Sequence, residues 1–381
     1  GWASRYCAGT PPAARTREPM TRKRIRLVLS DCHLGAAPVL RDGSANYLAD
    51  FLLDRKLVEF LEYHMSGEYA KAEVELIING DFFNHLQVFP DEERPELMTQ
   101  QVVFRRTAAI MNGHAEVFEA LTQFAAAPRH SVVFMIGNHD VGLLWPSVRR
   151  FVTSRLGPTV RVHEGPVYFD DGVWIEHGNQ RVAENRIDFD RPFVEDGEEE
   201  PIINVPWGSL FVVRYLNRMK KERPYIDKVY PFNLYLRWAL IHDTLFALRA
   251  SAMVLVYFMS VLLRLGENRR FSRRHFVKIM KEFSFPVKMD RAARSIFAEN
   301  PSCRVVVFGH GHQAASKLFG GGRQYFNTGI WNEMISLDLG SMGRQLKLTF
   351  VEISSERDGS PCGALREWKG AYREVEEVGR L

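Results

Sequence analysis

Four short apolar runs in this chain each lead into polar residues, and this repeated pattern constrains the fold more than any other feature of the sequence. The runs IRLVLS, VELIIN, SVVFMI and RVVVF are rich in β-branched residues, which is typical of buried strands. Shortly after them come Asp31 and His33, then Asp81, then Asn138 and His139, and finally His310 and His312. A sheet can therefore gather carboxylate, amide and imidazole groups at the ends of its strands.

A fifth segment, WIEHGN, adds His177, and two acids, Asp140 and Glu176, flank these positions. Any one of the histidines taken alone is best interpreted as a buried structural imidazole, but the whole set indicates a metal site. Oxygen and nitrogen donors without a thiolate suit Mn, Fe, Zn, Co or Mg better than a structural zinc site built on cysteines. Cys32 should alternate away from its neighbours Asp31 and His33, so we interpret it as a buried structural thiol.

The order of these segments resembles that of the calcineurin-like metallophosphoesterases. The family pattern is D-x-H, G-D, G-N-H-D/E, a lone H and G-H-x-H, and this chain has DCH, GD, GNHD, HG and GHGH in the same order. One such block occurs by chance in many chains, whereas five in order are specific. The resemblance implies an α/β fold, a two-sheet β-sandwich flanked by helices, and an enzyme that hydrolyses phosphoester or anhydride bonds.

The resemblance also implies a role for each matching residue. Two divalent metal ions are expected, with Mn as the first choice and Fe, Zn, Co or Mg as alternatives. The first ion would be held by Asp31, His33 and His312, the second by Asn138, His177 and His310, and both would share Asp81. His139 would lie beside the ions and protonate the leaving oxygen, and Asp140 would orient His139 through a hydrogen bond.

Four further residues are weaker candidates for contacts with the substrate. Asn84 follows the G-D block, and Arg323 stands in the hairpin after the G-H-x-H block. Arg181 and Arg186 follow His177, and guanidinium groups suit phosphate oxygens. Glu176 belongs to the strand before His177 and is given no catalytic role.

Hydrophobic periodicity predicts helices at 47–65, within 95–126 and at 146–156, and strands at 25–30, 74–78, 131–136, 160–163, 167–169, 173–176, 304–308 and 346–353. Segments 315–319 and 323–327 are predicted to form a hairpin across three glycines. We therefore expect a catalytic domain over 24–187 and 291–353, interrupted by a mostly helical insertion over 188–290. Residues 1–23 are expected to be a disordered extension and 354–381 a peripheral C-terminal tail.

The expected insertion segregates charge. Residues 204–290 contain 16 Lys and Arg against 6 Asp and Glu, a net charge of +10, although the whole chain carries only +4. The uncharged stretch 250–263 is shorter than the ~20 residues that span a bilayer. Two interpretations stay open: a buried helix that packs the insertion onto the sandwich, or an apolar surface beside clustered cations that meets lipid chains or an anionic membrane surface.

The core motifs indicate a phosphate-containing substrate but do not identify which phosphate compound it is. The S-D-x-H-L-G block and a lid-like insertion resemble the UDP-2,3-diacylglucosamine pyrophosphatase group, although that group carries Arg where this chain has His139. This resemblance implies a lipid-linked or nucleotide-linked pyrophosphate hydrolysed at the inner membrane surface. The alternative is a soluble phosphodiesterase, phosphatase or nuclease with the insertion as a structural cap.

Two further expectations follow from what the sequence contains. Nucleic acid is not expected as a partner, because no paired nucleic-acid-binding motif accompanies the basic insertion. The four scattered cysteines form no C-x-x-C pair, which fits a reducing, cytoplasmic location, peripheral at the inner membrane surface under the lipid interpretation. The sequence leaves the oligomeric state open.

Overall fold

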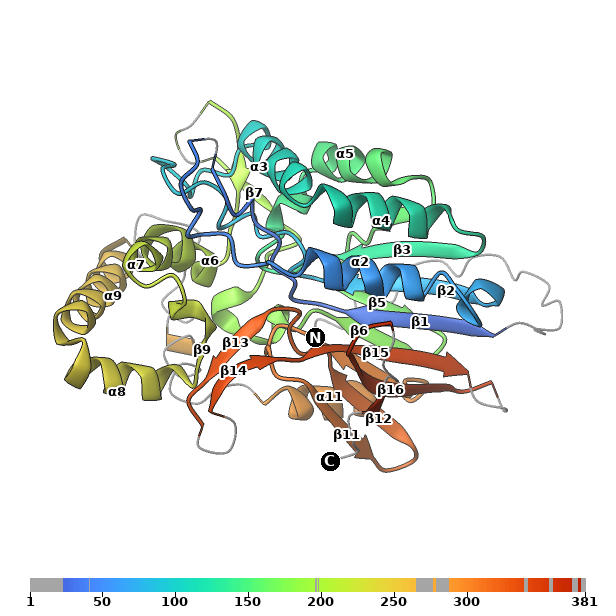
Figure 1. The fold of residues 1–381 in the computed structure, drawn as a ribbon. Coiled ribbons are helices and arrows are strands. Elements are labelled where there is room, and N and C mark those ends of the chain that lie inside the picture. The colour runs from blue at the N-terminus through green and yellow to red at the C-terminus, as the bar shows by residue number, and fades with distance from the viewer. Residues whose placement is uncertain are drawn as a thin grey trace.

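Two β-sheets pack face to face, and helices cover the outer face of each, as the computed structural model in Figure 1 shows. The structure describes residues 23–40, 42–195, 197, 199–264, 277–278, 288–338, 342–355, 359–371 and 376–377. The predicted two-sheet sandwich flanked by helices is confirmed. The disorder predicted for 1–23 falls, apart from Lys23, outside the described residues, as does most of the basic stretch 265–287.

The larger sheet has seven strands in the order β17-β16-β15-β1-β2-β3-β4. Its first four strands in the chain run parallel, whereas the C-terminal strands pair antiparallel to one another and to β1. The bounds are β1 (Arg24–Leu29), β2 (Glu73–Asn79), β3 (His130–Met135), β4 (Val160–Val162), β15 (Leu348–Ser355), β16 (Pro361–Trp368) and β17 (Glu376–Glu377).

Strand β16 corrects the prediction of a peripheral tail after residue 353. It pairs with β15 along its whole length, and Leu365 and Trp368 are buried. The segment PCGALREW is too polar to look like a core strand, but its buried positions Gly363 and Leu365 alternate with half-exposed ones. One apolar face was enough to make it part of the sheet.

The smaller sheet has five strands in the order β11-β12-β10-β6-β5, of which β6, β10 and β12 run parallel. The bounds are β5 (Val167–Asp170), β6 (Val173–Glu176), β10 (Val305–Phe308), β11 (Ala315–Phe319) and β12 (Arg323–Asn327). Side chains from the inner faces of both sheets form one apolar layer that includes Val28, Ile77, Val133, Ile175 and Val307. This layer holds the two sheets in fixed register, so the strand ends of one sheet face those of the other.

Helices cover the two outer faces. The larger sheet carries α2 (Asp54–Tyr63), α3 (Gln100–Gly113), α4 (Ala115–Ala126) and α5 (Pro146–Leu156), and the smaller sheet carries α11 (Met289–Glu299). The predicted helix at 47–65 is wrong over its first part, because residues 47–53 are not helical. There the Asn46 side chain bonds to Leu48 N and Ala37 O and holds a loop that still buries Leu48 and Phe51.

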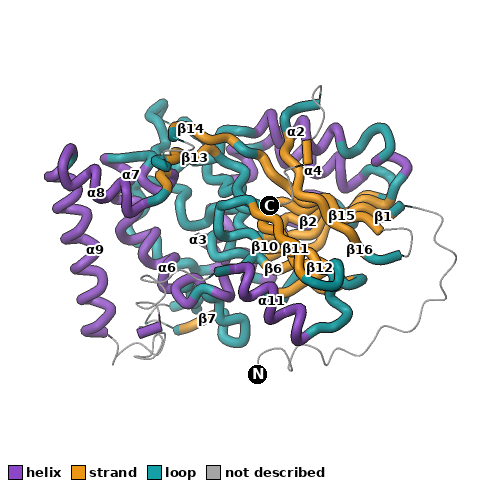
Figure 2. The backbone as a smooth tube through the Cα atoms, turned by 90° about the horizontal axis from the view of Figure 1, so that it is seen from below, coloured by secondary structure: helices purple, strands orange, loops and turns teal. Residues whose placement is uncertain are grey.

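Residues 207–264 form what we call the helical arm. It contains α6 (Trp207–Phe211), a π-helical segment (Val212–Leu216), α7 (Asn217–Glu222), β9 (Val229–Tyr230), α8 (Phe232–His242) and α9 (Thr244–Arg264). Figures 1 and 2 both show α7, α8 and α9 on one side of the molecule, beyond the two sheets. The arm has an apolar cluster of its own, and β9 pairs with β13 (Glu333–Ser336), whose other neighbour is β14 (Gly343–Leu346). Before the arm, β7 (Phe193–Val194) pairs with β8 (Ile202–Ile203).

Helix α9 divides its apolar residues between two faces. Phe246, Ala250 and Tyr257 are buried, and Tyr257 Oη donates to Trp207 O at 2.9 Å. Leu255 and Val256 are 63% and 60% exposed. The buried face agrees with the interpretation of a packing helix, and the exposed face leaves the interpretation of a lipid or membrane contact as a prediction. Across the part of the chain that the structure describes, no helix combines the length and apolarity needed to cross a membrane.

Candidate metal centre

The predicted metal ligands lie together at one edge of the sandwich, where parallel strands of both sheets end. Five strands supply them: β1 is followed by Asp31 and His33, β2 by Asp81, β3 by Asn138, β6 by His177, and β10 by His310 and His312. Side chains far apart in sequence meet because the carboxyl ends of these strands share one edge. Three overlapping groups of three donors result, each with its ligand atoms within 4.8 Å of one another.

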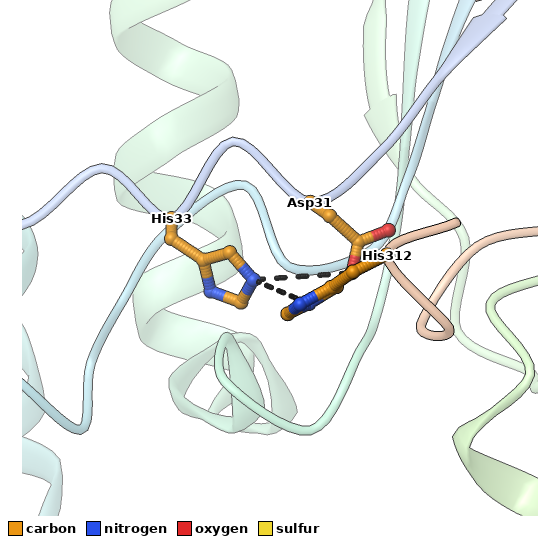
Figure 3. A group of neighbouring side chains, drawn as sticks. All are labelled: Asp31, His33 and His312. Carbon is orange, nitrogen blue, oxygen red and sulfur yellow. Dashed lines mark hydrogen bonds and ion pairs between the residues drawn. The ribbon is translucent and has the colours of Figure 1, made fainter. Parts of the chain in front are cut away.

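The first group consists of Asp31, His33 and His312, and Figure 3 shows both imidazole rings turned toward each other and toward the carboxylate. His312 Nε2 lies 3.3 Å from Asp31 Oδ1 and 3.3 Å from His33 Nε2. His33 Nε2 lies 3.8 Å from the same carboxylate oxygen. Three donor atoms therefore converge on one point.

The second group consists of Asp81, His177 and His310. His177 Nε2 lies 3.2 Å from Asp81 Oδ2, and its Nδ1 lies 2.7 Å from the carbonyl oxygen of Asn79. A carbonyl can only accept, so Nδ1 carries the proton and Nε2 is left as the donor atom for a metal. On the other side of the group, Asn185 Nδ2 lies 3.3 Å from His310 Nε2.

Asp81 belongs to the second group and lies next to the first. Its Oδ2 lies 3.2 Å from His177 Nε2 and 4.0 Å from His33 Nε2, and its Oδ1 accepts the backbone N–H of His139 at 2.8 Å. A third cluster of donors, formed by His33, Asp81 and His139, overlaps the first two. One carboxylate oxygen is thus placed between a histidine of each group, which is the position predicted for a bridging ligand.

The backbone at the candidate ligands is in the left-handed region. Among the described residues, seven other than glycine have a positive φ, and five of them are Asp31, His33, Asp81, His310 and His312, with φ between 54° and 62°. Residues with a side chain seldom adopt this conformation, and held outliers cluster at functional sites at a cost of about 1–3 kcal/mol each. The surrounding fold must therefore hold these side chains in place against their local preference.

Two glycines of the motifs leave room for the carboxylates. A Cβ on Gly137 would overlap Asp81 Oδ1, and a Cβ on Gly309 would overlap the hydroxyl of Ser30 next to Asp31. The glycines in G-N-H-D and G-H-x-H are thus explained by close approach of side chains from neighbouring strands.

Three buried donor atoms at this edge make no hydrogen bond of good geometry within the described part of the chain: Asp31 Oδ1, Asn138 Oδ1 and His177 Nε2. Two of these atoms have polar neighbours that are themselves candidate ligands, His312 beside Asp31 Oδ1 and Asp81 beside His177 Nε2. A buried polar atom without a partner costs about 1–3 kcal/mol, so such atoms are rare in folded proteins. All three are of the kind that binds Mn, Fe, Zn, Co or Mg. The residues present therefore fit divalent cations.

The charges of the groups act on the protonation states in both directions. Burial works to lower the pKa of His177, but the charges of Asp81 and Asp31 outweigh it and raise the pKa to about 10, and Asp31 likewise raises the pKa of His312 against burial. Burial works to raise the pKa of Asp81, but the charge of His177 outweighs it and the pKa falls well below its usual value. Burial and the charge of His177 lower the pKa of His310 to about 3, and burial also lowers that of His33 well below its usual value. Ionised carboxylates and neutral imidazoles are the forms that bind cations, so a cation at this edge would displace a proton from His177.

The partner of His139 differs from the prediction. Asp140 was expected to orient it, but the Asp140 carboxylate accepts the backbone N–H groups of Gly137 at 2.5 Å and Phe82 at 3.1 Å. His139 Nδ1 instead lies 3.0 Å from Oδ1 of Asn84. Because the short Asp140 side chain bonds back to its own loop, it shapes the turn that carries Asn138 and His139.

The structure gives three of the four candidate substrate contacts other partners. Asn84 is fully buried behind His139, so it orients that ring. Arg181 forms two hydrogen bonds with Glu176, at 2.9 and 2.7 Å. Arg323 donates to Phe297 O at the end of β12 remote from the site. Arg186 stays a prediction.

Other residues at the site were not predicted. Ser30 Oγ bonds to Asp31 and lies 2.6 Å from Thr328 Oγ1, which joins the ends of β1 and β12. Ser209 of the arm donates to the carbonyl oxygen of Asn138 at 3.0 Å. Ser30 is the serine of the S-D-x-H-L-G block, which is the signal that could have found it, whereas Ser209 stands in no recognisable motif.

No family model matches the chain, and no curated protein matches it. Similar solved structures include a predicted phosphoesterase from Streptococcus pneumoniae, with 10% identity over 94% of this chain and 99% of that one and a TM-score of 0.29. Vps29 complexed with zinc from Entamoeba histolytica has 10% identity over 93% and 98% of the two chains, with a TM-score of 0.28. A dimetal phosphatase from Danio rerio has 11% identity over 89% and 98%, with a TM-score of 0.33. Values this low say nothing about the reaction, which has to be inferred from the side chains.

Proposed function

We propose that this chain is a dinuclear-metal-dependent hydrolase of phosphoester or pyrophosphate bonds. The observation that carries the proposal is the position of Asp81 Oδ2, 3.2 Å from a histidine nitrogen of one donor group and 4.0 Å from a histidine nitrogen of the other. A carboxylate oxygen shared by two sets of donors is what a pair of cations needs. The unpartnered oxygens of Asp31 and Asn138 on either side support the same assignment.

Each residue has a defined part in this proposal. Asp31, His33 and His312 would hold one ion, Asn138, His177 and His310 the other, and Asp81 both. Such ions neutralise the charge of a phosphate and lower the pKa of water so that it can attack at neutral pH. His139 lies against His33, with ring centroids 4.5 Å apart, and is the group beside the cluster that can donate a proton to a leaving oxygen.

Two-cation sites occur in phosphatases, nucleases and aminopeptidases alike, so the geometry alone does not identify which kind of bond is hydrolysed. The five motifs, in the order of the calcineurin-like pattern, favour phosphorus chemistry over peptide hydrolysis. Manganese remains our first choice of metal, and Fe, Zn, Co and Mg remain alternatives because the donor set of oxygen and nitrogen accepts all of them.

Metal analysis combined with an activity assay tests the proposal. Purified protein supplied with Mn²⁺ should bind about two ions per chain and hydrolyse a chromogenic phosphodiester. Asp81→Ala should lose activity by on the order of 1,000-fold and bind less metal. Asp171→Ala is the matched control, because Asp171 is also a left-handed aspartate, with φ 48°, but lies on an exposed turn and pairs with Arg24. Active protein with one ion or none, or an unimpaired Asp81→Ala, contradicts the proposal.

We further propose a lipid-linked or nucleotide-linked pyrophosphate as the substrate, hydrolysed at an anionic membrane surface. Support comes from the exposed apolar side chains of the arm, namely Trp238, Leu240, Ile241, Leu245, Leu248, Leu255, Val256 and Met259. Contiguous exposed apolar surface marks interaction sites. The net charge of +10 over residues 204–290 suits anionic headgroups.

Vesicles separate this substrate from a soluble one. Anionic vesicles should raise turnover of a lipid pyrophosphate, and Val256→Ser together with Leu255→Ser should remove that increase while leaving a small chromogenic diester unaffected. A parallel fall with both substrates, or no change with either, favours a soluble phosphodiesterase with the arm as a cap. Metal-dependent cutting of a plasmid would favour a nuclease.

A further inference from the structure

A chain of side-chain amides joins His139 to the helical arm. His139 Nδ1 lies 3.0 Å from Asn84 Oδ1, and Asn84 Nδ2 donates to Gln87 Oε1 at 2.9 Å. Gln87 Nε2 donates to Asn217 Oδ1 at 3.0 Å, and Asn217 Nδ2 donates to the carbonyl oxygen of Leu86 at 2.9 Å. Asn217 is the first residue of α7, so the chain runs from the metal centre into the arm.

The carbonyl oxygen of Leu86 sets the direction of every bond in this chain. A carbonyl only accepts, so Asn217 must present its NH₂ to Leu86 and its oxygen to Gln87. Gln87 must then donate to Asn217 and accept from Asn84, and Asn84 must turn its oxygen to His139. The Nδ1 of His139 is therefore a donor to Asn84, which holds the ring in the Nδ1–H tautomer.

Burial makes this orientation effective. Asn84 and Gln87 are 0% and 2% exposed, so water does not compete for their amides. Reversing one amide would place two donors or two acceptors face to face in the interior, which costs about 1–3 kcal/mol. The arrangement therefore fixes both the tautomer and the plane of the His139 ring.

The arm end of the chain is itself held in place. Lys220, one turn after Asn217 on α7, pairs with Asp50 at 2.5 Å and with Asp227 at 2.7 Å, and it is fully buried. Ser209 on α6 donates to the carbonyl oxygen of Asn138 at 3.0 Å. The start of the arm thus contacts the loops at the ends of both β2 and β3.

From this arrangement we infer that Gln87 and Asn217 are positioning residues through which the helical arm sets the tautomer and orientation of His139. The inference rests on the proposed function in that His139 acts as the proton donor to the leaving oxygen. It goes beyond that function by making the arm, in addition to any part in substrate binding, a component of the proton-transfer geometry.

The dependence of rate on the leaving group tests the inference. A misplaced proton donor harms esters of a poor leaving group such as phenol more than esters of a good one such as 4-nitrophenol. For Asn217→Leu and Gln87→Leu we expect kcat to fall by about 10- to 100-fold with a phenyl ester and by far less with a 4-nitrophenyl ester, with KM unchanged. Arg218→Ala, an exposed change on the same helix, is the control and should match the wild type with both esters.

A second measurement does not depend on activity. In protein loaded with diamagnetic Zn²⁺, the nitrogen chemical shifts of His139 should report Nδ1–H in the wild type and a changed tautomer population in Asn217→Leu. Asn217→Asp, which keeps the oxygen that accepts from Gln87, should stay closer to the wild type than Asn217→Leu.

Folded variants with the wild-type tautomer and the wild-type leaving-group dependence overturn the inference. If the wild type hydrolyses no phosphoester, the proposed function fails, and the tautomer measurement still decides whether the arm orients His139. If Asn217→Leu and Gln87→Leu do not fold, Asn217→Ala, which removes the same amide without added bulk, is compared with Arg218→Ala and decides it by the same two readouts.

Discussion

The metal centre and the helical arm both place side chains in unfavourable environments, but of opposite kinds. At the centre, left-handed residues and buried polar atoms without partners hold polar groups where a cation would satisfy them. On α8 and α9 the backbone is regular and apolar side chains such as Ile241, 74% exposed, face outward. The contrast teaches that the two regions differ in the chemistry they present: donor atoms that fit divalent cations at the sandwich edge, and apolar side chains on the outer face of the arm.

The largest expected effect on this comparison comes from adding a side chain to the metal centre without replacing a candidate ligand. Gly137→Ala places a Cβ where Asp81 Oδ1 lies, so we expect kcat to fall by about 100- to 1,000-fold, together with less bound metal. Gly320→Ala is the control, because a Cβ there meets no atom within 4 Å. Unchanged metal content and rate in Gly137→Ala would show that the shared position of Asp81 is unimportant.

The next largest effect, on the free energy of unfolding, is expected where the arm joins the sandwich at Lys220. Lys220→Met removes the buried cation shared by Asp50 and the half-buried Asp227 and leaves Asp50 only the 3.5 Å pair with Lys228, which should lower the free energy of unfolding by about 3 kcal/mol. Lys221→Met, an exposed change on the same helix, should stay within about 0.5 kcal/mol of the wild type. Urea denaturation measures both, and equal stabilities would mean that the arm is attached by other contacts.

Acid should destabilise the sandwich through His64. Burial lowers the pKa of this histidine to about 4, and its Nδ1 donates to Phe60 O at 2.7 Å. Between the ordinary pKa of about 6.5 and pH 4 the unfolded chain binds the proton more tightly, so stability is full above pH 6.5 and falls by about 3 kcal/mol on the way to pH 4. In His64→Asn this fall should be smaller by that amount in urea denaturation at each pH. Parallel curves for the variant and the wild type would rule out His64 as the cause.

The smallest expected effect concerns the exposed and buried faces of α9 in the arm. Leu255→Ser and Val256→Ser remove exposed apolar groups and should change the free energy of unfolding by less than about 0.5 kcal/mol. Tyr257→Phe, on the buried face, loses the bond to Trp207 O and should cost about 1 kcal/mol. If the two serine variants destabilise the chain more than Tyr257→Phe, the outer face of α9 serves folding.

The sequence predicted the parts of this structure that depend on local patterns. Strand β6, the hairpin of β11 and β12, and helix α5 have the predicted bounds, because alternation, glycine turns and a proline at the helix start are encoded locally. The candidate ligands followed from their places after strands. Their left-handed backbone did not, since nothing in D-x-H or G-H-x-H shows that residues such as His310 and His312 leave the extended conformation.

The predictions that failed concern which partner a side chain contacts in the folded chain. Arg181 could meet either a substrate or Glu176, and only the structure shows the two hydrogen bonds to Glu176. Asp140 follows His139 directly, yet its carboxylate bonds to backbone N–H groups instead. The amide chain through Gln87 and Asn217 joins residues 130 positions apart, a pairing that a single sequence cannot reveal.

The pairing of β1 with β15 has a consequence for how the protein is made. Ile25 and Ser354 are partners in this ladder, so the larger sheet cannot close until nearly the whole chain has left the ribosome. Asp31 is synthesised 281 residues before His312, a delay of about 15–60 s at ordinary rates of translation. During that time the nascent chain exposes strand edges and unpaired ligands together, so its yield should depend on holding chaperones and on slow, cool expression.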